Sequence, residues 1–375
     1  SGGKFEDYGI YTQVEQLNKT ALKSHGLDSN GQLYKINSFE FYRYEDIIKK
    51  EDDAGYDKTA FEKMLEIKGD SDHTKLIDML TDLNDYSIGI EDVLKEHFDE
   101  ENIVYWMAFQ ILMGNVDTQN RNVYLYSPLN SDIWYFIAWD NDGCLMRSEY
   151  ELKNFSDQGS WEKGISNYWG NVLFQRCLKS RSFREKLNDA ILDLREYLNK
   201  DMLTSKIESY KNVLKPYLYS MPDAEYEPLT SEQYDQIAAS LPDEIEKNYQ
   251  LYLESLETPM PFYIGVPTID GDKLKFNWDI SYDLDAEDIT YSVEVARDYL
   301  FQDVIYQNTT LTVPETEMEL PNTGQYFVRV RATNTSGKTQ DAFDYYVTDE
   351  GKHYGMRCFY ITEDSTVEED DYEEG

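Results

Sequence analysis

The stretch that decides the fold is GNVDTQNRNVYLYSP, residues 114–128. Its polar loop contains Asp117 and Asn122, and an alternating, strand-like run leaves the loop. The preceding run, residues 101–115, is apolar on nearly every helical face, which predicts a buried helix. A second strand-like run, WYFIAWDNDG at 134–143, completes a predicted hairpin and ends in acidic residues. The sequence therefore predicts polar side chains gathered where a buried helix and a hairpin meet.

Length and charge set the outer bounds on fold and partners. A chain of 375 residues predicts two domains, because one ordinary core rarely grows so large. The net charge of −38 would repel nucleic acid and anionic lipid, so neither is an expected partner. No apolar run is long enough to cross a bilayer, so membrane insertion is not expected. No leader opens the sequence, and we expect any leader to lie outside this chain.

The cysteines and histidines do not predict a disulfide framework or a structural zinc site. The three cysteines lie far apart without a CxxC pair, and the four histidines are scattered. Closely spaced ligand pairs mark structural zinc sites, and disulfide scaffolds usually hold an even number of cysteines. A centre built on histidine or cysteine would therefore have to be assembled entirely by the fold.

Hydrophobic periodicity predicts a mostly helical first part. Residues 4–22 resemble a strand that leads into a helix, and 26–46 resemble two short β runs around an SNG turn. Apolar spacings of three and four then predict helices across 57–98 and again across 160–255. These apolar stripes are expected to pack in the core, since amphipathic helices mainly bury one face.

The sequence changes character at ETPMPF, residues 257–262, where proline appears and the helical period stops. Short strand-like runs separated by turn residues predict a β-sandwich over residues 256–362. Trp278 is expected to fill its core, and Tyr326 fits a tyrosine-corner position. The acidic end, 363–375, is predicted to be disordered. The runs predicted as strands are 273–281, 289–297, 311–315, 324–334 and 341–348.

The spacing of polar residues around the hairpin matches the catalytic lobe of a protein kinase. There, a loop Asp accepts the proton of the attacking hydroxyl, and an Asn five positions later and an Asp after the hairpin hold Mg²⁺. Asp117, Asn122 and Asp140 stand in that order. The alternative is that these residues only cap helices and form turns, which Asp and Asn commonly do.

Four stretches together resemble the CotH kinase family, named after a spore-coat protein. They are YGIYTQVEQLNK, GQLYK, GNVDTQNRNVYLY and WYFIAWDNDG. The resemblance covers residues 1–255 and implies an atypical protein-kinase-like fold, so the fold class expected is α+β. The β region resembles a fibronectin type III or immunoglobulin-like sandwich. In the family, further strands precede the YGIY block, so the resemblance implies N-terminal strands that this sequence does not contain.

The resemblance also assigns roles to individual residues. Asp117 becomes the catalytic base, and Asn122 and Asp140 become ligands of Mg²⁺ or Mn²⁺ bound with ATP. Asp142 becomes a group that supports these ligands or binds a second metal ion. Two further residues, Glu15 and Lys35, fall in blocks that could contact the nucleotide. For these two, the alternative is a surface charge on a β-hairpin.

The resemblance implies a bacterial, secreted or cell-surface kinase that phosphorylates Ser or Thr of a coat or surface protein. The β-sandwich would then bind a protein or polysaccharide, or act as a spacer. One alternative is a non-catalytic surface module that keeps a kinase-like fold. A second alternative is an acidic, cation-binding scaffold, of which EDDAG and WDNDG are faint signs.

Overall fold

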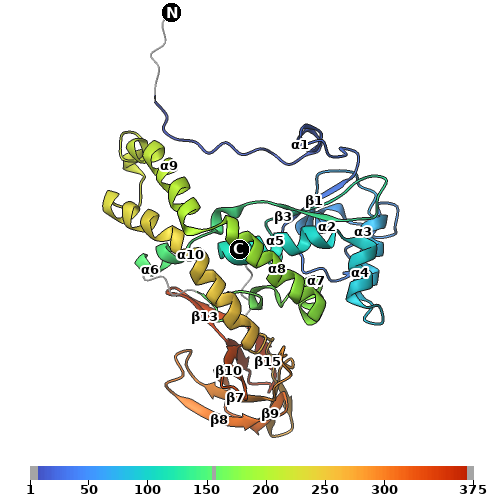
Figure 1. The fold of residues 1–375 in the computed structure, drawn as a ribbon. Helices are drawn as coiled ribbons and strands as arrows, with labels where there is room; N and C mark the ends of the chain where they lie inside the picture. Colours follow the sequence, from blue (N-terminus) through green and yellow to red (C-terminus); the bar gives the residue numbers. More distant parts are fainter. Residues whose placement is uncertain (1–6, 154–157, 370–375) are drawn as a thin grey trace, which may run out of the picture. The chain divides into compact units, whose positions relative to one another are not determined.

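The computed structural model describes residues 7–153 and 158–369, which fall into two compact units. The first unit contains residues 7–153 and 171–249, and the second contains 158–170 and 250–369. Helices around a small sheet make up most of the first unit, and β-sheets most of the second (Figure 1). This content agrees with the predicted α+β class.

The sheet of the first unit is antiparallel and has the strand order β2-β1-β3-β4. Its strands are β1 (Gln32–Ile36), β2 (Leu65–Ile67), β3 (Val123–Ser127) and β4 (Tyr135–Ala138). The predicted hairpin is confirmed as β3 and β4, with Tyr124 opposite Ile137. On its other side β3 pairs with β1, which places Lys35 opposite Tyr124.

The buried helix predicted before the loop is confirmed as α5 (Glu100–Met113). The Asp99 carboxylate caps its first turn by accepting the Asn102 N–H at 2.9 Å. The Asn102 side chain also donates to Phe136 O at 3.1 Å and accepts from Phe136 N–H at 2.6 Å. It therefore occupies backbone groups that β4 presents at the edge of the sheet.

The remaining helices begin mostly at Asn, Asp or Ser caps. Asn171 caps α7, and Ser180 both ends α7 and caps α8, so the helical run predicted there is two helices. The bounds are α1 (Lys19–Ser24), α2 (Lys58–Met64), α3 (Thr74–Asn84), α4 (Ile90–His97), α6 (Arg147–Lys153), α7 (Val172–Lys179), α8 (Arg181–Tyr197), α9 (Lys200–Leu218) and α10 (Ser231–Glu257), with short 3₁₀ turns η1 (Asn141–Gly143), η2 (Ser166–Tyr168) and η3 (Asp223–Glu225). Within the described chain, no helix is both long and apolar enough to cross a membrane.

Two sequence predictions for the N-terminal part are wrong. Residues 7–17 form no strand, and the helix begins only at the Asn18 cap; residues 4–6 lie outside the described residues. Apolar and polar side chains partly alternate along residues 7–17, but this segment pairs with no strand among the residues described. Alternation predicts a strand only where a partner supplies the hydrogen bonds.

Of the β runs predicted around the SNG turn, one is confirmed and the rest are wrong. Only β1 forms there, and its partners β2 and β3 come from distant parts of the sequence. Residues 37–46 form no strand. Moreover, β2 lies inside the 57–98 region predicted to be helical.

The second unit contains two antiparallel sheets that share one core. One has the order β5-β6-β9 and the other β15-β14-β10-β7-β8, with β11 beside β10. Trp278 lies in the shared core, as predicted, with Val293 and Phe359. The strands are β5 (Thr268–Asp270), β6 (Lys273–Asn277), β7 (Ile289–Ala296), β8 (Val304–Leu311), β9 (Glu315–Glu319), β10 (Gly324–Asn334), β11 (Thr339–Asp341), β14 (Met356–Ile361) and β15 (Val367–Glu369), with a separate hairpin of β12 (Tyr345–Thr348) and β13 (Gly351–Tyr354).

Three details of the predicted sandwich can be compared with the structure. Tyr326 donates its O–H to Asn322 O at 2.8 Å, which is the bond expected at a tyrosine corner. Within the strand predicted at 311–315, residues 312–314 instead form the turn between β8 and β9, because proline at 314 cannot donate within a ladder. Part of the predicted disordered tail forms β15, and residues 370–375 lie outside the described part of the chain.

His73 is fully buried in the first unit within an aromatic cluster. Its Nδ1 lies 2.7 Å from the Tyr34 hydroxyl, and its ring stacks on Phe61 with centroids 4.2 Å apart. Burial lowers the pKa of His73, because the cluster disfavours the charged imidazolium. Nearby carboxylates oppose this shift: Glu51, Asp72 and Asp70.

We expect His73 to make the first unit lose stability as the pH falls below about 6.5, the value for an unfolded histidine. Below that pH the unfolded chain binds a proton that the folded chain resists, so the loss grows until the lowered folded-state pKa is reached. Denaturant unfolding at pH 7 and pH 5 measures it. His73→Gln should reduce the difference. An equal pH dependence in His73→Gln would contradict this assignment.

Candidate catalytic site

The loop that carries Asp117 begins at a tightly packed helix end. Gly114 ends α5 with φ of 65°, and a Cβ there would meet the Asn248 side chain at 2.6 Å. Only glycine combines this left-handed conformation with so close an approach. Asn115 N–H then donates to Gln110 O at 3.0 Å, which ties the first loop residue back to the helix.

Side chains and backbone from elsewhere in the first unit hold the middle of the loop. Asn120 donates to Glu40 Oε1 at 2.7 Å, and its carbonyl accepts the Phe39 N–H at 2.8 Å. Asn171 donates to Gln119 O at 2.8 Å. The loop is therefore fixed on both sides of Asp117.

Asp117 and Asn122 are brought together, as their spacing predicted. Asn122 Nδ2 donates to Asp117 Oδ2 at 2.7 Å and to Asp117 O at 3.2 Å. Asn122 has φ of 58° immediately before β3, so the chain turns sharply between the loop and the strand. Arg121 Nε lies 3.5 Å from Asp117 Oδ1 and forms an ion pair that the sequence analysis did not anticipate.

The surroundings of Asp117 shift the pKa of its carboxyl in both directions, with a net rise. Its side chain is 53% exposed, yet partial burial raises the pKa of the carboxyl. Arg121 and the hydrogen bond from Asn122 act in the opposite direction. The negative charges of Asp142 and Asp140 raise the pKa again, so both aspartates lie within electrostatic range of Asp117.

Asp140 and Asp142 follow β4 on the neighbouring loop. Asp140 has φ of 53° and precedes η1, and both carboxylates are exposed. Among the described residues, no group of three or more His, Cys, Asp or Glu is clustered to hold a metal. Mg²⁺ usually takes one or two protein carboxylates and fills its remaining positions with phosphate and water. Because Asn122 donates Nδ2 to Asp117, its Oδ1 is the atom suited to a cation.

Glu15 and Lys35 do not contact Asp117 in any interaction that we observe. Glu15 Oε2 lies 2.7 Å from His25 Nε2, and this surface pair lowers the pKa of Glu15. Lys35 stands on β1 opposite Tyr124 on one side and Glu66 on the other. By strand alternation, Lys35 shares a sheet face with Tyr124. Their predicted contact with a nucleotide remains a prediction.

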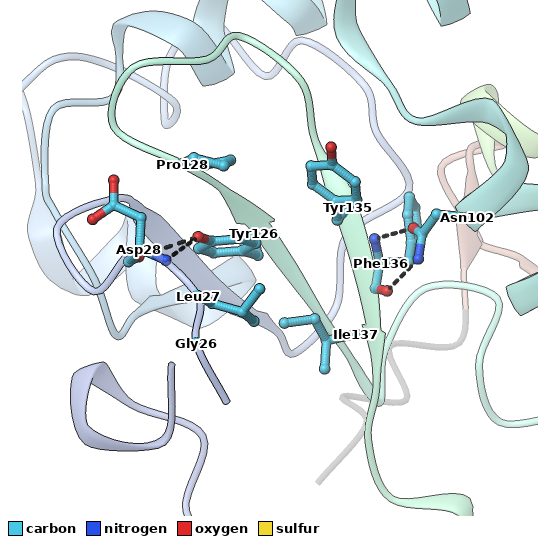
Figure 2. Close-up of a pocket in the computed structure, with 9 residues that line it drawn as sticks. All are labelled: Gly26, Leu27, Asp28, Asn102, Tyr126, Pro128, Tyr135, Phe136 and Ile137. Carbon is cyan, nitrogen blue, oxygen red and sulfur yellow. Dashed lines mark hydrogen bonds between the residues drawn. The ribbon is translucent and has the colours of Figure 1, made fainter. Parts of the chain in front are cut away.

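A pocket of about 520 Å³ lies at the opposite end of the hairpin from Asp117. Figure 2 shows Tyr126 bonded to Asp28 at one end and Asn102 bonded to the backbone of Phe136 at the other. The walls are mainly apolar and aromatic, which is usual for small-molecule sites. The lining residues are Gly26, Leu27, Asp28, Asn102, Tyr126, Pro128, Tyr135, Phe136 and Ile137.

Comparisons with known proteins give one family and no close relative. A family model described as CotH kinase protein matches residues 2–252. No curated protein matches this chain. One matching solved structure is that of the surface layer protein SbsC, domains 1–6, at 12% identity, covering 88% of this chain and 41% of that one. This chain thus spans less than half of that protein, and the TM-score of 0.15 carries no structural argument.

Proposed function

Because this chain belongs to the CotH kinase family, we propose that it is an atypical protein kinase. It transfers the γ-phosphoryl group of ATP to a Ser or Thr hydroxyl of a secreted, coat or cell-surface protein of a bacterium. The observation that carries the proposal is the bond between Asn122 Nδ2 and Asp117 Oδ2. It joins two residues whose roles in phosphoryl transfer are complementary.

In this proposal Asp117 orients the acceptor hydroxyl and takes its proton. The new P–O bond forms as the bond from the γ-phosphorus to the β,γ-bridging oxygen breaks, and ADP leaves with that oxygen. The hydrogen bond from Asn122 to Oδ2 fixes the carboxylate and leaves Oδ1, beside Arg121, for the incoming hydroxyl. Asn122 Oδ1, Asp140 and Asp142 would hold Mg²⁺ or Mn²⁺. When bound, the cation would neutralise charge on the phosphates. Since transfer of this kind needs little covalent chemistry from the protein, positioning supplies most of the rate.

Tyr124 and Tyr126 share one sheet face, where both are buried with Leu22 and Leu33. The nucleotide is proposed to occupy the pocket beside Tyr126 and the region near Asn122. From Asn122 to Tyr126 the strand advances four residues, about 13 Å. An extended nucleoside triphosphate could therefore place its phosphates near Asn122 and its base in the apolar pocket beside Tyr126. Lys35 shares this face and would supply positive charge to the phosphates.

The second unit is proposed to be a fibronectin type III-like module that binds a surface protein or polysaccharide. Support comes from its strand order. β5, β6 and β9 form one sheet, and β7, β10 and β14 lie in the other. If the strands from β5 to β10 and then β14 are counted along the chain, the first sheet holds strands one, two and five, and the second holds strands three, six and seven. Immunoglobulin-like sandwiches divide these six strands in the same way. Such modules are common on cell surfaces, so we propose export as well.

Calorimetric titration with ATP, in the presence of Mg²⁺ or Mn²⁺, tests the function. We expect metal-dependent binding that Asp140→Asn weakens at least about 10-fold. Asp132→Asn, at an exposed site in the turn between β3 and β4, is the matched control and should bind like the wild type. Absence of ATP binding by the wild type would contradict the kinase proposal and favour a non-catalytic surface module.

A further inference from the structure

Asp117 and the Asp140–Asp142 segment lie on two loops that leave different elements. The first loop joins α5 to β3, and the second follows β4. Their backbones meet at Met113, the last residue of α5, and Leu145, which follows η1: Leu145 N–H donates to Met113 O at 2.8 Å. That contact does not reach the carboxylates, so something else must fix the position of one acidic group relative to the other.

Asn115 makes contacts to both loops. It is 2% exposed, and its Oδ1 accepts the Asp117 N–H at 3.3 Å. Its Nδ2 donates to Asn141 Oδ1, between Asp140 and Asp142, at 3.4 Å. The Asn115 carbonyl accepts from Thr118 Oγ1 at 3.2 Å. One buried amide thus contacts the backbone of the base and the side chain that separates the two aspartates.

Gln110 completes the arrangement from within α5. It is fully buried, and its Nε2 donates to the same Asn141 Oδ1 at 3.0 Å. Its Oε1 accepts no hydrogen bond from any residue that the structure describes. Burying a glutamine whose oxygen accepts no hydrogen bond costs free energy of folding. The folded chain nevertheless keeps Gln110 in this position, where it donates to Asn141.

Packing around Asn115 leaves little freedom. A Cβ added to Gly143 would meet Asn115 Oδ1 at 2.9 Å, so the second loop lies directly against the Asn115 side chain. Amides suit this position for an electrostatic reason. An amide both donates and accepts without a charge, whereas a carboxylate would add a further negative charge beside Asp117, Asp140 and Asp142.

We propose that Asn115, Gln110 and Asn141 form an amide latch, in which they are positioning residues that hold the two acidic loops in register. The significance of the latch for catalysis rests on the proposed function, but the coupling between the loops does not. Sequence analysis did not single out these residues, although Asn115 and Asn141 lie within the very blocks GNVD and WDND that it compared with the family.

Amide hydrogen exchange on the full chain tests the latch without requiring activity. Asn115→Ala should accelerate exchange about fivefold in residues 139–145 as well as in 115–119, the change expected when one hydrogen bond is lost. Asn141→Leu should accelerate exchange in 115–119 by a similar factor.

The matched control is Asn120→Ala. Asn120 lies in the same loop, but its side chain bonds Glu40 and not the second loop. It should accelerate exchange in its own loop and leave 139–145 unchanged. If Asn115→Ala resembles this control, and Asn141→Leu leaves 115–119 unchanged, the latch does not exist.

Phosphoryl transfer supplies a second measurement. Asn115→Ala should lower kcat about 10- to 100-fold and change the KM for ATP less than about twofold, because positioning affects the transition state more than ground-state binding. An unchanged kcat would overturn the positioning role. If the wild type neither binds nor uses ATP, the kinase proposal fails, while the exchange measurements still decide whether the loops are coupled.

Discussion

Asp117→Asn is expected to lower the rate of phosphoryl transfer by about 10²- to 10⁴-fold while leaving the melting temperature nearly unchanged. The substitution removes the group that accepts the hydroxyl proton but keeps size and shape. An amide oxygen can still accept from Asn122 Nδ2, which lies 2.7 Å from Asp117 Oδ2 in the wild type. The side chain is 53% exposed, so little packing is at stake.

The measurement is transfer of labelled γ-phosphate from ATP, both to the protein itself and to a generic Ser/Thr acceptor protein. Thermal unfolding is followed in parallel. Asp132→Asn makes the same chemical change at an exposed site away from the loop and should retain activity. Full activity in Asp117→Asn would show that another group is the base. A large fall in melting temperature would show that Asp117 is structural.

Arg176→Met is expected to destabilise the first unit by about 3 kcal/mol, a fall in melting temperature of roughly 6–12 °C. Arg176 is 7% exposed and lies in α7. Its guanidinium donates to Leu83 O and Ile88 O, and to Asp85 O at 3.4 Å. These carbonyls belong to the end of α3 and the turn after it, where a cation also complements the helix dipole. Methionine would fill the space but leave buried carbonyls without donors.

Arg184→Met is the matched control for this change. Arg184 also donates to carbonyls near a helix end, to Leu178 O at 2.6 Å and Lys179 O at 3.2 Å, but it is partly exposed. Water can replace it, so we expect a loss below about 1 kcal/mol. Denaturant unfolding of both variants measures the difference. Equal losses would mean that Arg176 is not the buried anchor of this turn.

Local patterns predicted the elements that depend mainly on their own residues. The buried helix α5 and the hairpin of β3 and β4 both follow from patterns over a few residues. The Trp278 core position and the Tyr326 hydrogen bond follow from strand alternation in the same way. Short-range geometry suffices in each case, because the backbone period fixes which side chains meet.

Contacts between distant residues could not be predicted from these patterns. β1 pairs with strands about 30 and 90 residues away, and no local signal names those partners. Glu15 pairs with His25 on the surface, and no local pattern predicted that pair. Asn115 resembles a turn residue in sequence, and only the folded chain shows that it touches Asn141. A single buried amide produces no periodic pattern in the sequence that could reveal it.

Helix α5 joins the apolar pocket to the loop that carries Asp117, and this fixes its length. At one end Asn102 bonds the edge of β4, and at the other Gly114 packs against Asn248. Inserting or deleting one residue between them would rotate one end by about 100° relative to the other and displace one of these contacts. Over evolution, length changes in related chains should therefore collect in the turn between β3 and β4, and the interval from Asn102 to Gly114 should remain constant.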